Sequence, residues 1–188
     1  MDSMSKLIKI AHQQAGLFTA SQAENAGFNR TNHSYHVSSG NWVKEGWGLY
    51  SLPLISKAET SFYWKLYLWT RNKYDKPQAV ISHETALNIH ELSDINPTNV
   101  HFTVPKNFRK TAVKPKGLIL HKENIDPNFI TTFEGLNITN PIKTLIDVNK
   151  DSSCSIDILE QAVKEALKKG LVSKSEIKKF PELLEYAL

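Results

Sequence analysis

The sequence predicts an α+β protein in which an N-terminal winged helix-turn-helix is followed by a mixed α/β C-terminal domain. Two observations lead to this fold class. Residues 17–52 follow the order helix, glycine turn, helix and glycine-containing hairpin. From residue 79 onward, short apolar strand patterns are interspersed with helical ones. A chain of 188 residues suits two small domains, and we expect their bounds at 1–56 and 79–188, with a linking helix over 57–78.

The helix-turn-helix is expected to begin at Thr19, whose hydroxyl can cap a helix over residues 20–26. Gln22 stands three residues later and can complete a capping box. Gly27 ends this helix, because glycine adopts a positive φ at little cost. A second helix is expected over 28–39, and the residues that share its inner face are Phe28, His33 and Val37.

The helix-turn-helix is followed by a predicted two-stranded ribbon. Residues 42–43 and 49–52 predict its strands, and the turn over 45–48 contains two glycines. A helix-turn-helix cannot bury enough apolar surface alone. We therefore expect an opening helix over 5–15 to pack behind it.

The second helix carries few apolar residues and many polar ones, which suits it to enter a DNA groove. Arginine can bind guanine bidentately and asparagine can bind adenine, and the first residues of such a helix are those that reach base edges. A lysine on the ribbon can contact a phosphate. The alternative is an ordinary helical hairpin with a solvated polar face. The predicted DNA-contacting residues are Thr19, Asn29, Arg30, Thr31, Asn32, Ser34, Tyr35 and Lys44.

The composition is typical of a soluble globular protein. Its 23 Lys and Arg against 19 Asp and Glu give a net charge of +4, which permits nucleic-acid contact without requiring it. The single cysteine, Cys154, excludes an internal disulfide and a multi-cysteine zinc site, so a cytoplasmic location is expected. The first residues lack the pattern of a signal peptide. No apolar run approaches the ~20 residues of a membrane span, so we expect no membrane partner.

An aromatic segment over 60–74 predicts the buried helix that links the two domains, with Thr60 or Ser61 as its cap. The alternative is a stacking surface for single-stranded nucleic acid. In the second domain the patterns predict strands over 100–104, 118–121, 129–133 and 136–139 and helices over 82–92, 141–148, 155–169 and 173–180.

A strongly basic loop is expected over residues 106–116, which contain no acidic residue. Such a loop is either solvated or a surface for an anionic partner: DNA, RNA or an acidic protein. Its five cations are Lys106, Arg109, Lys110, Lys114 and Lys116.

Enzymatic and metal-binding motifs are not evident. His83 and His90 are spaced to share one helical face with Glu84 nearby, but no third metal ligand has suitable spacing. Asp147 follows apolar helical residues, where some nucleases hold a metal, yet no second acid and lysine complete that constellation. A P-loop, a GxGxxG motif and a Ser–His–Asp arrangement are also missing. We therefore expect no cofactor and no catalytic residue.

Two stretches together resemble a known family. The first comprises residues 18–23, the Gly27 turn and residues 48–52 at the end of the wing. The second comprises Ser-His-Glu-Thr-Ala-Leu at 82–87, followed by 100–105 and by Thr-Leu-Ile-Asp at 144–147. The chain is similar in these stretches, over roughly residues 7–148, to AbiEi-type antitoxins and transcriptional regulators of type IV toxin–antitoxin, or abortive-infection, systems.

The resemblance implies a winged helix that binds inverted repeats in its own promoter and represses it, and a C-terminal antitoxin domain. The cognate toxin would be a nucleotidyltransferase-like protein, with or without direct contact. The protein would be a monomer or weak dimer that pairs on DNA. Two alternatives stay open: a winged-helix transcription factor without a toxin, and a nuclease-like enzyme in the C-terminal half.

Overall fold

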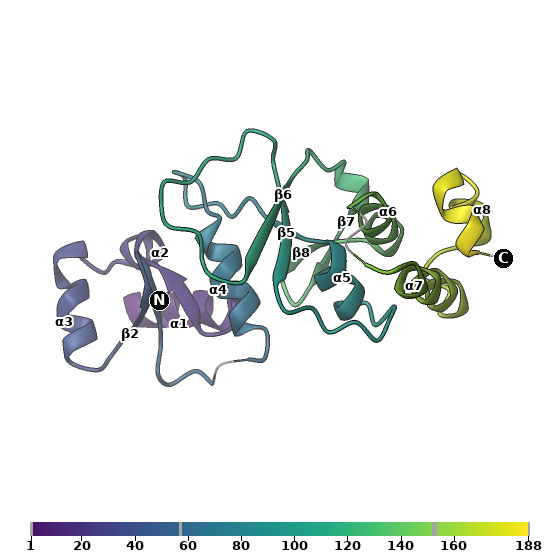
Figure 1. The fold of residues 1–188 in the computed structure, drawn as a ribbon. Coiled ribbons are helices and arrows are strands. Elements are labelled where there is room, and N and C mark those ends of the chain that lie inside the picture. Colours follow the sequence, from purple (N-terminus) through teal and green to yellow (C-terminus); the bar gives the residue numbers. More distant parts are fainter. Residues whose placement is uncertain (1, 57, 152–153, 188) are drawn as a thin grey trace. The chain divides into compact units, whose positions relative to one another are not determined.

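The computed structural model describes residues 2–56, 58–151 and 154–187 and shows an α+β protein (Figure 1). The chain divides into two compact units, Met1–Gln78 and Ala79–Leu188. Residue 57, where we expect the linking segment to begin, lies outside the described residues. The rest of that segment belongs to the first unit. Among the described residues, no helix is long and apolar enough to cross a bilayer.

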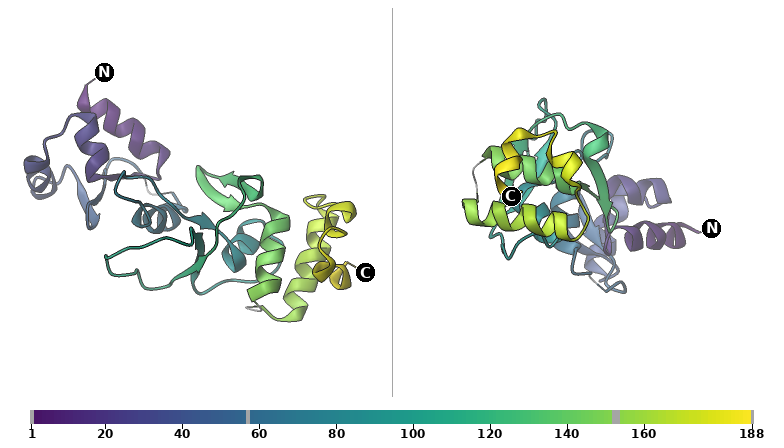
Figure 2. Two further views of the ribbon diagram at one scale, coloured as in Figure 1. Left: turned by 90° about the horizontal axis from the view of Figure 1, so that it is seen from above. Right: turned by 90° about the vertical axis from the view of Figure 1, so that its right-hand side faces the viewer.

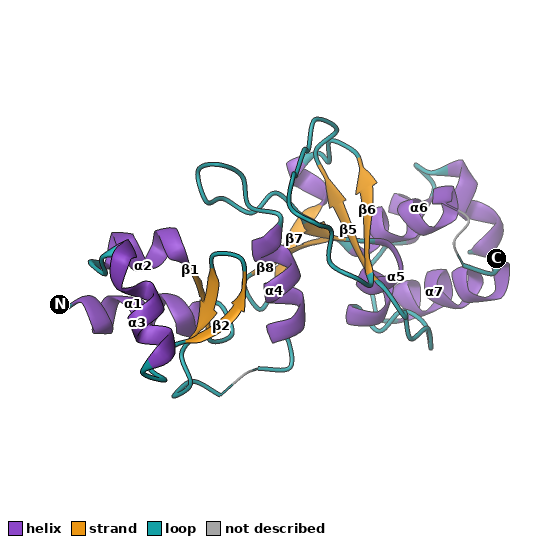
Figure 3. Cartoon of the chain, turned by 60° about the vertical axis from the view of Figure 1, so that its left-hand side comes forward, coloured by secondary structure: helices purple, strands orange, loops and turns teal. Residues whose placement is uncertain are grey.

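The first unit contains helices around a small antiparallel sheet of order β1-β3-β2 (Figure 3). The pairing of β1 with β3 and of β3 with β2 is antiparallel, and the β2–β3 register shifts between Lys44 and Gly46. Its elements in chain order are α1 (Ser3–Gln13), β1 (Leu17–Thr19), α2 (Ala20–Ala26), η1 (Arg30–Asn32), α3 (His33–Ser38), β2 (Val43–Gly46), β3 (Leu49–Ser51) and α4 (Ser61–Trp69).

The residues expected to begin and end helix α2 do so, but the second helix of the expected helix-turn-helix is shorter than predicted. Thr19 and Gln22 form the capping box, and Gly27 ends α2 with a φ of 108°. The side chain of Asn29 accepts a hydrogen bond from the backbone N–H of Thr31. Asn29 therefore acts as a cap, and the helical region begins after it, as a 3-10 turn that continues into α3.

Trp42 lies at the centre of the first unit's core, only 1% exposed. Its ring contacts Phe18 edge-on at 4.9 Å and Phe28 at 5.2 Å, and it stacks on His36 at 4.6 Å. The other buried residues of this core are Leu7, Ala11, Phe18, Ala23, Ala26 and Leu52. Trp42 thereby joins the hairpin to the inner face of α3.

The aromatic helix α4 is largely buried, as expected, but it packs within the first unit. The hydroxyl of Ser61 donates to the carbonyl of Ala15 at 3.1 Å, in the segment before β1. Phe62 and Tyr74, by contrast, are 54% and 70% exposed. Thr60 occupies the N-cap position without a capping hydrogen bond from its side chain.

The second unit is built on a mixed five-stranded sheet of order β6-β5-β4-β8-β7. Strand β5 is parallel to β6, β4 is parallel to β8, and the pairs β4–β5 and β7–β8 are antiparallel. The strands are β4 (Val80–Ile81), β5 (Val100–Val104), β6 (Leu118–Lys122), β7 (Ile130–Phe133) and β8 (Leu136–Thr139).

The helices of this unit pack on one another and enclose a second apolar core. Leu87, Leu145, Leu159 and Val163 are at most 5% exposed and belong to the same cluster. Figure 2 shows the C-terminal helices stacked side by side. These elements are α5 (His83–Ile89), η2 (Pro127–Phe129), α6 (Pro141–Asp151), α7 (Ile156–Lys168), α8 (Lys174–Ile177) and η3 (Pro181–Tyr186).

Candidate nucleic-acid interface and a histidine cluster

The outward face of η1 and α3 presents polar side chains to solvent. Arg30 is the most accessible cation there: its side chain is 80% exposed and its guanidinium lies 3.7 Å from the carboxylate of Glu24. Tyr35 is 66% exposed. The exposed residues among those expected to contact DNA are Asn29, Arg30, Thr31, Asn32, Ser34, Tyr35 and Lys44.

The inward face of α3 is built from histidine as well as aliphatic side chains. His33 is 4% exposed, and its ring lies 5.1 Å from that of Trp42. Burial lowers the pKa of His33, more strongly than the nearby Glu24 raises it. The imidazole is therefore neutral at pH 7, which allows it to act as a core residue.

A groove of about 490 Å³ lies between α3 and the β2–β3 hairpin. It brings Arg30 and Ser34 from the helix beside Lys44 from the hairpin. Asn29, Thr31, Asn32 and Tyr35 are not among its lining residues. The complete lining is Ala20, Arg30, His33, Ser34, Val37, Ser38, Lys44, Trp47, Gly48 and Tyr50.

Thr19 does not belong with the exposed set. It is 1% exposed, its hydroxyl accepts from the backbone N–H of Gln22, and the same hydroxyl donates to the carboxylate of Asp75. Its role as a helix cap occupies the group that a DNA contact would need. The sequence-based inclusion of Thr19 among the DNA-contacting residues is thus wrong.

The sequence interpretation missed Arg71, which holds the hairpin turn. One terminal nitrogen of its guanidinium donates to the carbonyls of Trp47 and Gly48, at 3.0 and 3.2 Å. Its Nε pairs with Asp75 at 3.1 Å. Gly48 has a φ of 60°, and a Cβ there would lie 3.1 Å from this guanidinium. Arg71 lies far from the turn in sequence, so no local pattern indicates this contact.

The basic loop connects β5 to β6 in the second unit. Lys106, Arg109, Lys114 and Lys116 are exposed, whereas Lys110 is half-buried. Within this loop Phe108 is buried, at 5% exposure. The backbone N–H of Lys106 donates to the side chain of Asn124 at 3.0 Å. Four of the five predicted cations are therefore presented to solvent.

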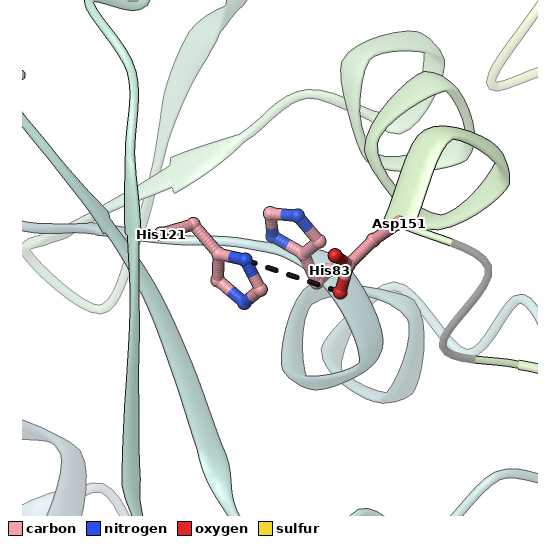
Figure 4. A group of neighbouring side chains, drawn as sticks. All are labelled: His83, His121 and Asp151. Atoms are coloured by element: carbon pink, nitrogen blue, oxygen red, sulfur yellow. Dashed lines mark ion pairs between the residues drawn. The ribbon is translucent and has the colours of Figure 1, made fainter.

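Three histidines that are distant in sequence meet in the second unit. His83 stacks on His121 with ring centroids 3.5 Å apart and planes 13° apart (Figure 4). His101 lies beside them, with its Nδ1 3.1 Å from Nε2 of His121. His90 is elsewhere, with its Nε2 2.8 Å from the carbonyl of Thr139. His83 and His90, whose spacing suggested a shared helical face, thus have different partners, because the sheet brings His83 to β5 and β6.

Polar groups surround this histidine cluster of His83, His101 and His121. Asp151 Oδ2 lies 3.9 Å from Nδ1 of His121, and Glu84 Oε2 lies 3.7 Å from Nε2 of His101. Burial, together with the nearby His121 and His101, lowers the pKa of His83 to about 3. Burial also lowers the pKa values of His101 and His121. All three imidazoles are neutral at pH 7.

A buried charged group lies on the same helix as Asp151. Lys143 is 5% exposed; its Nζ bonds to both carboxylate oxygens of Glu123 at 3.0 Å and to Asp147 one helical turn along. Burial raises the pKa of Asp147 to about 6, although Lys143 opposes this. The expectation that Asp147 has neither a lysine nor a second acid beside it is wrong. Glu123 follows β6, so only the fold brings it to α6.

The chain matches no protein-family profile and no curated protein. It is similar in fold to the crystal structure of the RV2827C protein from Mycobacterium tuberculosis. That similarity has a TM-score of 0.51 at 14% identity and covers 99% of this chain and 82% of the other. At this identity the similarity concerns the fold alone.

Proposed function

We propose that the first unit is a winged helix-turn-helix that binds double-stranded DNA. The observation that carries the proposal is the groove that Arg30, Ser34 and Lys44 line together. A reading helix and a cationic hairpin on one face can contact base edges and phosphates at the same time.

Arg30 and the asparagines at the start of the short helix are the proposed base readers. In helix-turn-helix proteins the N-terminal residues of the second helix contact bases, and these residues are exposed here. The side-chain oxygen of Asn29 accepts a hydrogen bond from Thr31, while its NH₂ group can donate to a base. Lys44 is the proposed phosphate contact.

We further propose that this binding represses the chain's own operon and that the protein is an antitoxin of a type IV toxin–antitoxin system. The motifs at 18–23, 82–87 and 144–147 support this assignment through their resemblance to AbiEi-type proteins. Inverted repeats would engage two copies about one helical turn, ~34 Å, apart. The cognate partner would be a nucleotidyltransferase-like toxin in the cytoplasm.

The basic loop is the proposed surface for an acidic partner. Four of its five cations are exposed, and no acidic residue lies between 106 and 116. If the toxin is contacted directly, neutralising Lys106, Arg109, Lys114 and Lys116 abolishes protection while operator binding persists. If protection survives this change, the loop is a solvated surface that does not contact the toxin.

A gel-shift titration with the chain's own upstream DNA and a scrambled duplex tests the proposal. Arg30→Ala should weaken specific binding by about 1–3 kcal/mol, which is roughly 5- to 150-fold. Lys9→Ala, which removes an exposed cation from α1, is the control for net charge. Equal affinity of the two variants for the operator removes Arg30 from the site, and equal affinity for both duplexes refutes specific binding.

Co-expression with the neighbouring gene tests the antitoxin assignment separately. Growth arrest by that gene product, relieved by this chain, supports it. A chain that binds its operator but has no toxin to counteract is a stand-alone transcription factor.

A further inference from the structure

We propose that His83, His121 and Asp151 form a binding site for a divalent transition-metal ion, with Zn²⁺ the best match. One ligand atom from each residue lies within 4.8 Å of the other two (Figure 4). The site is in the second unit and does not depend on the proposed DNA binding.

Each proposed ligand comes from a different element. His83 is the first residue of α5, His121 lies near the end of β6, and Asp151 is the last residue of α6. Thr103 of β5 is the register partner of His121. Because residues two apart on a strand face the same side, His101 and Thr103 both border this site. A bound ion would connect a strand to two helices.

Hydrogen bonds engage one nitrogen of each imidazole and leave the other nitrogen for a metal. Nε2 of His121 is engaged with His101, which leaves Nδ1 directed towards Asp151. Nδ1 of His83 lies 2.9 Å from the hydroxyl of Ser82, which also accepts from Thr103. Metal-binding histidines commonly use one nitrogen for the metal and the other for such a partner. Here His83 and His121 each have one ring nitrogen engaged by a protein partner.

The backbone at His83 adds a second observation. His83 has a φ of 52°, a conformation that is rare for residues with a side chain. Such conformations persist only where the surrounding structure holds them, and they cluster at functional sites. With this backbone conformation the imidazole of His83 stacks on His121 and is 5% exposed.

The chemistry of the three groups selects the ion. Two neutral imidazoles and a carboxylate suit Zn²⁺ and related transition metals, whereas Mg²⁺ and Ca²⁺ prefer oxygen ligands alone. A fourth, tetrahedral position would be filled by water. The side chain of Asp151 is 41% exposed, so an ion can reach the site from solvent.

Binding requires a small rearrangement of the rings. A metal lies in the plane of each imidazole that binds it, and two parallel stacked planes cannot share one ion. Ligand atoms around Zn²⁺ lie roughly 3.4 Å apart, given Zn–N bonds near 2.1 Å. One ring therefore turns about its broad Cβ–Cγ torsion and the ligands draw together.

Metal titration of the full-length, tag-free chain, after treatment with a chelator, tests the proposal. We expect one Zn²⁺ per chain by elemental analysis, and visible d–d absorption when Co²⁺ is used instead. Asp151→Asn should weaken Zn²⁺ binding at least tenfold, and His121→Ala should abolish it. The controls are Asp157→Asn, an exposed acid on α7, and His12→Ala, an exposed histidine on α1.

Glu84, which lies beside His101 and is not a proposed ligand, gives a further readout. Glu84→Gln keeps all three ligands but removes the charge beside His101, which contacts the ligand His121, and it should lower the affinity for Zn²⁺ less than Asp151→Asn does. Asp151 and Glu84 are not core residues, so these two variants keep the fold, which circular dichroism verifies. Absence of stoichiometric Zn²⁺ binding, or equal binding by Asp151→Asn and Asp157→Asn, overturns the proposal and leaves a metal-free histidine network.

Discussion

Truncation of Trp42 should destabilise the first unit more than any surface change nearby. Trp42 is 1% exposed, and five aromatic or imidazole rings lie within 5.4 Å of its ring. Its indole N–H has no hydrogen-bond partner among the described residues. The loss on Trp42→Ala is therefore a loss of packing and apolar burial, without a hydrogen-bond contribution.

Two estimates of the magnitude agree. Burying an aromatic side chain removes roughly 150–250 Å² from water, which at ~25 cal/mol per Å² is about 4–6 kcal/mol. Core Trp→Ala substitutions typically cost ~3–5 kcal/mol. We expect a loss of about 4 kcal/mol. A unit of this size has a free energy of unfolding of roughly 4–12 kcal/mol, at ~0.05–0.15 kcal/mol per residue, so Trp42→Ala removes at least about a third of it.

Amide hydrogen exchange, resolved by peptide, measures this loss unit by unit. Protection in β1, α2 and β3 should fall by about 1000-fold, because each 1.4 kcal/mol is tenfold, while the second unit stays unchanged. Trp47→Ala is the matched control: it removes the same side chain from the same hairpin, where it is 91% exposed. A protection loss in Trp42→Ala no larger than in Trp47→Ala would refute the assignment of Trp42 as the centre of this core.

Three further outcomes follow from individual residues. Lys44→Ala should reduce the slope of log K against log salt by about 1 in DNA titrations, and an unchanged slope removes Lys44 from the phosphate contacts. Because burial lowers the pKa of His33, the unfolded chain takes up a proton first as pH falls below 6.5. The free energy of unfolding of the first unit should therefore decline below pH 6.5. Denaturant titration should show a smaller decline for His33→Gln than for the unsubstituted chain. Lys143→Met should cost about 3–5 kcal/mol at pH 7, since it leaves Asp147 buried and unpaired. With burial raising the pKa of Asp147 to about 6, that cost should shrink when unfolding is measured below pH 5.

The fold follows from the sequence where the signals are local. The capping boxes at Thr19 and Ser173 each involve a partner three residues away, and both form. Alternation in 100–104 and the terminating role of Gly27 are equally local. The length of the second helix was misjudged because Asn29 competes for the same backbone N–H groups that the helix would use. Ser82 holds the cap position, yet its hydroxyl bonds to Thr103 and His83 instead.

The candidate sites also differ in whether local sequence signals predict them. Exposure of Arg30 and Lys44 could be predicted, because a polar run on a short helix and a hairpin is a local property. The cluster of His83, His101 and His121 could not, since its members come from α5, β5 and β6. Parallel pairing of β5 with β6 across the basic loop sets His101 near His121. No spacing rule anticipates that pairing.

The helix proposed to read DNA is held in place by residues outside the set proposed to contact DNA. Helix α3 has six residues, too few to be stable alone. Its position relative to the hairpin is set by Trp42 on the inner side and by the hold of Arg71 on the turn. The outer residues are thereby free to differ without cost to the fold. If α3 reads DNA as proposed, substitutions at Arg30 and the asparagines should change the specificity for an operator, whereas loss of Trp42 or Arg71 should lower the affinity for every operator.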